Sequence, residues 1–99
     1  MTPIAHSETI HIAADHPALP GHFPGAPVVP GVVLLDHVVA AVQRRWKMRV
    51  VGLPQVKFLH PLKPGHAVQL TIEREDMSAR FRVLDGAHVL ASGLIEVGA

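Results

Sequence analysis

The sequence predicts a single α+β domain whose elements follow the order strand, helix, then four strands. Three observations support this order: one long apolar stretch of helical length, several segments that alternate between apolar and polar residues, and turn residues between those segments. A length of 99 residues fits one domain, so residues 1–99 are taken as a unit.

The helix is expected from about residue 29 or 30 to residue 45. Pro30 suits a first helical turn, where its missing N–H costs nothing. Nearly every residue from 32 to 42 is apolar, which is typical of a helix surrounded by protein on every side. Asp36 is the exception, and a buried carboxylate requires a partner or a function.

A first strand is expected at residues 7–14, where Ile10 and Ile12 share one face. Residues 50–59 form the second strand, and Gly52 and Pro54 within it indicate a bulge or a sheet edge.

The remaining three strands are expected at residues 67–75, 79–84 and 87–97. The first of these places Val68, Leu70 and Ile72 on one face, so it covers a core with one side only. Asp85-Gly86 is a strong hairpin signal between the last two strands.

Composition indicates a protein that associates with a second subunit. Apolar residues make up 48% of the chain and charged residues 17%, against roughly 25% charged in ordinary soluble domains. Because so short a chain has a small core, the apolar excess is expected at a subunit interface.

Several classes of protein are not expected. The chain has no cysteine, no basic and apolar leader, and no uninterrupted apolar run of membrane-spanning length, so a cytoplasmic protein without a membrane anchor is expected. Its eight histidines match no compact zinc spacing, and one tryptophan with three phenylalanines gives no nucleic-acid stacking platform. The prolines at 24, 27 and 30 lie among apolar residues, unlike an exposed polyproline ligand.

The most informative stretch spans residues 21–36 and reads Gly-His-Phe-Pro-Gly-Ala-Pro-Val-Val-Pro-Gly-Val-Val-Leu-Leu-Asp. Its prolines constrain the loop that carries His22, just before the helix that carries Asp36. This ordered set, together with Val-Lys-Phe-Leu-His-Pro-Leu-Lys-Pro-Gly at residues 56–65, resembles the 3-hydroxyacyl-acyl carrier protein dehydratases of the FabA/FabZ type.

The resemblance implies a hot-dog fold, in which one central helix is wrapped by a curved antiparallel sheet of about five strands. It also implies a homodimer with active sites at the subunit interface, where His22 of one subunit meets the acid of the other. The substrate would be an acyl chain on the phosphopantetheine arm of acyl carrier protein, in fatty acid or related biosynthesis. No metal and no cofactor are expected.

Dehydration of a 3-hydroxyacyl thioester needs one base and one acid. His22 suits the base, because its ordinary pKa of about 6.5 leaves much of it neutral at pH 7. Asp36 would be the acid, which requires a desolvated site that raises its pKa above the ordinary value of about 3.9. The resemblance assigns Gly31 to the N–H that polarises the thioester carbonyl, with Val32 beside it, and Phe23 and Pro30 complete the substrate-binding set.

Two alternatives stay open. A hot-dog thioesterase would use Asp36 to activate water and would have less need of His22. A non-catalytic acyl-binding or partner subunit is favoured by Ala40, which stands where this family often has a glutamine one turn after the acid. The four cations among residues 44–49 either complement the helix dipole or dock an acidic carrier protein.

Overall fold

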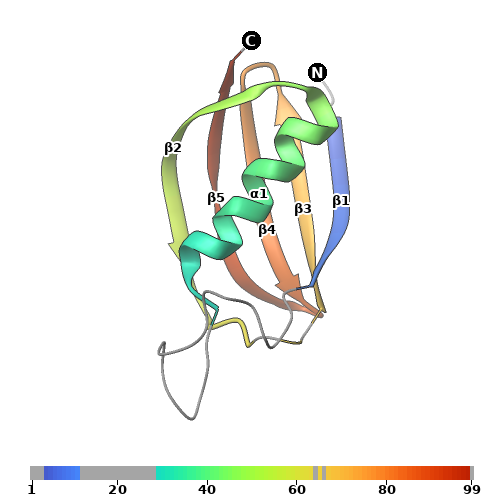
Figure 1. Cartoon of the computed structure of the whole chain (residues 1–99), viewed down its shortest axis with the longest axis vertical. Coiled ribbons are helices and arrows are strands. Elements are labelled where there is room, and N and C mark those ends of the chain that lie inside the picture. The colour runs from blue at the N-terminus through green and yellow to red at the C-terminus, as the bar shows by residue number, and fades with distance from the viewer. Residues whose placement is uncertain (1–3, 12–28, 64, 66, 99) are drawn as a thin grey trace.

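One helix lies across one face of a five-stranded antiparallel sheet (Figure 1). The computed structural model describes residues 4–11, 29–63, 65 and 67–98. In chain order the elements are β1 (Ile4–His11), α1 (Gly31–Trp46), β2 (Arg49–Phe58), β3 (Ala67–Glu75), β4 (Ser78–Asp85) and β5 (His88–Gly98).

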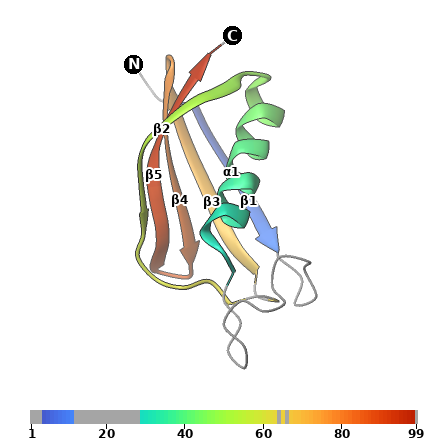
Figure 2. The same cartoon turned by 60° about the vertical axis from the view of Figure 1, so that its left-hand side comes forward.

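The strands lie side by side in the order β1-β3-β4-β5-β2, so β1 and β2 form the two edges of the sheet. The strand that follows the helix therefore pairs with the last strand of the chain, not with β1. The sheet curves around α1, which crosses its strands diagonally (Figures 1 and 2). This arrangement confirms the expected fold of one helix wrapped by five strands.

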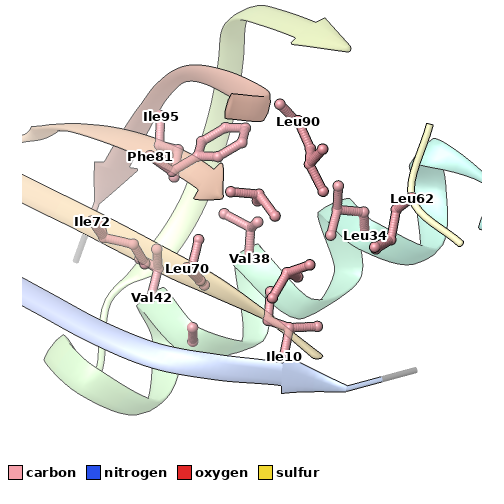
Figure 3. Packing of buried hydrophobic residues seen from close by; sticks show 14 of the residues in the cluster. Ile10, Leu34, Val38, Val42, Leu62, Leu70, Ile72, Phe81, Leu90 and Ile95 are labelled. Carbon is pink, nitrogen blue, oxygen red and sulfur yellow. The ribbon is translucent and has the colours of Figure 1, made fainter. Parts of the chain in front are cut away.

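The core lies between α1 and the sheet (Figure 3). One face of the helix contributes Val33, Leu34, Val38, Ala41 and Val42. The sheet contributes alternate residues of its strands, because successive side chains point to opposite faces of a strand. Those in β3, β4 and β5 include Val68, Leu70, Ile72, Phe81, Val83 and Ile95, all buried.

The opposite face of α1 is open in the single chain. The expectation that protein surrounds the helix on every side is therefore wrong for one subunit taken alone. Val32, Asp36 and Ala40 are all exposed. They follow one another at four-residue spacing, which places them on a single stripe of the helix. A sheet covers only one face of a helix, and the apolar composition of residues 32–42 did not reveal which residues turn away from it.

The strand predictions are confirmed with small shifts of their ends. The first strand begins earlier than expected, at Ile4, and its expected end at residues 12–14 lies outside the described residues. The edge suggested by Gly52 and Pro54 is confirmed, since β2 borders the sheet and its pairing with β5 shifts register around Gly52. Gly86 adopts a left-handed φ of 59° in the turn between β4 and β5.

The carboxyl end of α1 is fastened to the sheet by charged and aromatic contacts. Arg44 donates to the Glu8 carboxylate of β1 at 3.1 Å, and His6 Nε2 lies 2.8 Å from the same carboxylate. Two guanidinium groups lie over the Trp46 ring, with Cζ of Arg45 5.4 Å and Cζ of Arg74 5.6 Å from the ring centroid. Two of the cations expected at the helix end thus make contacts within the chain.

Partial burial would raise the pKa of Glu8, but the hydrogen bonds and charges of His6 and Arg44 outweigh it and hold that pKa below its ordinary value. Among the described residues, no helix is long and apolar enough to cross a membrane.

Candidate active site

The amino end of α1 is tied to the segment that leaves β2. Val29 N–H donates to the carbonyl of Leu62 at 2.8 Å, just before the helix begins. The N–H groups of Leu59 and His60 both donate to the carbonyl of Leu90, at 2.8 and 3.2 Å. The segment 59–62 therefore bridges β5 and the helix start, and it fixes the distance between them.

A hollow of about 420 Å³ opens where these parts meet. Its lining comes from the helix start and from the end of β2 with the bridge that follows, and consists of residues 29–32, 34 and 58–62. Most of these side chains are apolar, while His60 is the titratable residue among the described lining. A mostly apolar hollow with few polar groups is typical of a small-molecule site.

The first turn of α1 offers two backbone donors to this hollow. Pro30 precedes the helix with φ −59° and ψ 141°, and its carbonyl accepts from Val33 N–H at 3.0 Å and from Leu34 N–H at 3.4 Å. The N–H groups of Gly31 and Val32 come before these, and the first N–H groups of a helix have no partner within it. Among the described residues neither has an acceptor. Such donors at the positive end of the helix dipole can bind a developing oxyanion.

Gly31 is pressed against an aromatic ring. A Cβ atom at this position would lie 2.7 Å from Cζ of Phe58 and 3.0 Å from Cε1. Real Cβ atoms do not approach a ring so closely, so only glycine allows the ring to rest here. Gly31 also lines the hollow.

The structure brings together three of the expected site residues, because Pro30, Gly31 and Val32 all line the hollow. Asp36 does not line it, and its side chain is exposed. The desolvated environment expected for Asp36 is therefore absent from the described part of the single chain. The other two expected residues, His22 and Phe23, lie outside the described residues.

Sequence reasoning missed the part of the hollow built by Phe58, His60 and Leu62. The sequence of residues 56–65 predicts a strand and a turn, but nothing in it indicates their contact with the helix start. The pairing of a glycine with an aromatic ring 27 positions away leaves no periodic signal, so only the folded chain reveals it. In the described residues no group of three or more His, Asp or Glu side chains is placed to hold a metal ion.

Comparison with known families gives a match over most of the chain. Residues 5–94 match the family model of the ApeI-like proteins, described as ApeI dehydratase. Among curated proteins, the 3-hydroxyacyl-[acyl-carrier-protein] dehydratase FabZ of Chlamydia trachomatis is 30% identical, over 84% of this chain and 65% of that protein. This chain thus spans just under two thirds of the length of that relative.

Solved structures show the same fold over the whole chain. The dehydratase heterocomplex ApeI:P from Xenorhabdus doucetiae superimposes with a TM-score of 0.82 at 26% identity, covering 100% of both chains. An (R)-hydratase from A. caviae involved in PHA biosynthesis gives a TM-score of 0.75 at 16% identity, covering 98% of this chain and 95% of the other. The hot-dog fold implied by residues 21–36 is therefore confirmed.

Proposed function

Because the chain belongs to the ApeI-like dehydratase family, we propose that it removes water from a 3-hydroxyacyl thioester to give the trans-2-enoyl thioester. The observation that carries this proposal is the apolar hollow lined by Gly31 and Val32, whose amides have no acceptor among the described residues. The carrier is acyl carrier protein, as in the name of the Chlamydia relative, and the pathway is fatty acid or related acyl-chain biosynthesis.

The helix start supplies the electrostatic part of the reaction. Loss of the proton on carbon 2 moves negative charge onto the thioester oxygen, and an N–H held in place before the reaction stabilises that charge without reorganising. Gly31 N–H binds this oxygen, with Val32 beside it. Pro30 and Phe23 complete the surface that holds the substrate.

The proton transfers belong to His22 and Asp36. Neutral His22 takes the proton from carbon 2, and Asp36, directly or through a water, protonates the departing hydroxyl group. This role needs Asp36 to be covered, although its stripe of α1 is exposed in the single chain. A second subunit packed on that stripe would cover the carboxyl group and remove it from water.

The same reasoning supports a dimer with shared active sites. The edge strand β2 carries Val51 and Leu53 in exposed positions, with a free row of backbone hydrogen-bonding groups at the sheet edge. A second copy that pairs with β2 covers these side chains and brings the Asp36 stripe of one subunit toward the site of the other. We propose a homodimer of this kind, which the notable apolar content of the chain also favours.

Two observations favour a second assembly. The ApeI:P structure is named a heterocomplex, and Ala40 replaces the glutamine often found one turn after the acid. A chain that serves as the partner of a related subunit would fold and bind acyl groups but would not turn them over alone. Turnover by the purified chain alone would favour the homodimer, and its absence would favour the partner subunit.

Two variants test the catalytic pair. We expect His22→Ala and Asp36→Asn each to reduce turnover of a 3-hydroxyacyl thioester by at least about a hundredfold, the usual contribution of a positioned acid or base. Circular dichroism and light scattering should show an unchanged fold and subunit number. Near-normal turnover in either variant would contradict the assignment, and loss in Asp36→Asn alone would favour the thioesterase.

A further inference from the structure

We propose that Phe58 is a specificity-determining residue, which restricts the site to acyl groups without a substituent on carbon 2. This inference rests on the proposed dehydration and names the acyl class that the same hollow accepts. It concerns the width of the site beside the thioester, not the length of the acyl chain.

The ring of Phe58 lies beside the position that the reacting end of the substrate takes in the proposed reaction. Its Cζ atom rests against Gly31, the residue whose N–H binds the thioester oxygen in the proposed reaction. Carbon 1 carries that oxygen, and carbon 2 is bonded directly to carbon 1. The ring is therefore a close neighbour of carbon 2, and a methyl group there would compete with the ring for the same space.

The backbone around this contact leaves little room for adjustment. Phe58 pairs with Ala91 of β5, and the next two N–H groups both donate to Leu90. On the other side, Val29 N–H holds the helix start to Leu62 at 2.8 Å. Because both walls are anchored, the space beside Gly31 widens only if the ring itself turns away.

The ring is also open to a ligand. Phe58 is 53% exposed in spite of its contact with Gly31, so one side of the ring packs against the helix start and much of the rest remains accessible. An exposed aromatic side chain on the wall of an apolar hollow is suited to contact with substrate. Leu34 and Leu62 also line the hollow and would meet other parts of the acyl chain.

The test compares a linear 3-hydroxybutanoyl thioester with its 2-methyl counterpart, which keeps one proton on carbon 2. We expect the wild-type protein to prefer the linear substrate by about tenfold or more in kcat/KM, the discrimination typical of one methyl group in a fitted pocket. In Phe58→Ala and Phe58→Leu this ratio should fall toward one. The relative rates for linear chains of four and eight carbons should change little.

Met77→Ala is the matched control, since it truncates an exposed apolar side chain at the β3–β4 turn, away from the hollow. It should keep the wild-type ratio. An unchanged ratio in both Phe58 variants would overturn the proposal, as would a change in chain-length preference without a change in the methyl ratio.

Binding of unreactive analogues separates this proposal from the dehydration itself. Calorimetry would compare pantetheine-linked butanoyl and 2-methylbutanoyl amides, neither of which can react. We expect about tenfold weaker binding of the branched amide to the wild type and nearly equal binding to Phe58→Ala. If the wild type turns over no thioester but shows this difference, dehydration fails and the role of Phe58 stands. Equal binding of both amides to the wild type would overturn it.

Discussion

Gly31 combines two requirements that no other residue meets at the helix start. Its lack of a side chain lets Phe58 rest against it, and its amide is proposed to bind the thioester oxygen at the hollow that it lines. Elsewhere in a helix, replacement of glycine by alanine stabilises by roughly 0.5–1 kcal/mol. Here the added Cβ would collide with the Phe58 ring, which must then move toward the space that substrate occupies.

We therefore expect Gly31→Ala to separate stability from activity. The melting temperature should change little, because the partly exposed ring can turn away and the helix gains a better helix former. The value of kcat/KM should fall by about a hundredfold, since a small displacement of positioning groups has effects of that size. A variant with normal kcat/KM would show that a displaced Phe58 ring does not disturb the substrate site.

The ionisation of Glu8 is expected to make the stability of the fold depend on pH. Its pKa is lower in the folded chain than in the unfolded chain, so its ionised form stabilises the fold above the unfolded value of about 4.5. This contribution is lost as the pH falls through the folded pKa. The groups that face it are His6 and Arg44.

Glu8→Gln should therefore melt at a lower temperature than the wild type at pH 7, by an amount that reflects at most about 1 kcal/mol for a partly exposed ion pair. The difference should shrink as the pH falls below 4.5 and should be lost once the pH passes below the lowered pKa of Glu8 in the folded chain. Glu75→Gln, at an exposed position of β3, is the control and should show no such trend. A gap that does not shrink as the pH falls would contradict the assignment.

The candidate site was predictable from sequence only where its residues are neighbours in the chain. Pro30, Gly31 and Val32 were expected together and lie together, because one turn of helix positions all three. Phe58 comes from a distant strand, and its contact depends on how β2 leaves the sheet. The exposure of Asp36 was not foreseen, because apolar residues on every side of a helix do not show which side the chain itself covers.

Among the strands, β2 offers the surface best suited to contact with a second subunit. It lies at the sheet edge, includes a proline, and exposes Val51 and Leu53. Natural edge strands are usually protected against pairing by charges or coverage, so these exposed apolar residues support the proposed pairing of β2 with a second subunit.

We expect Leu53→Lys to weaken the dimer while leaving the fold of each subunit intact. A buried lysine without a partner is costly at an interface, so light scattering at micromolar concentration should show monomers where the wild type shows dimers. Turnover should fall together with the dimer, because Asp36 would then remain exposed. Met77→Lys, at an exposed site on the β3–β4 turn, should leave the dimer unchanged. A wild-type chain that is monomeric would contradict the proposed interface.

The elements themselves were largely predictable because each has a local signal. Alternation placed Val68, Leu70 and Ile72 on the buried face of β3, and the turn at Gly86 followed from its sequence. The order of strands in the sheet was not readable from those signals. That β2 pairs with β5 depends on packing between parts of the chain about 40 residues apart, and only the folded chain shows it.

At the scale of the whole molecule, an apolar chain of 99 residues has one sheet face filled by its only described helix. The other face of that helix carries Asp36 and remains open, and the hollow lies at the end of the same helix. Both features fit a site that two subunits complete. We propose that such a site dehydrates a 3-hydroxyacyl thioester.

One assay tests the claim of dehydration. It follows conjugated enoyl absorbance and free thiol release in the same sample of a 3-hydroxyacyl thioester. We predict enoyl product without thiol, and loss of that signal in His22→Ala. Release of thiol without enoyl product would contradict the claim and identify a thioesterase. Absence of both signals across several chain lengths would contradict it in favour of a binding or partner subunit.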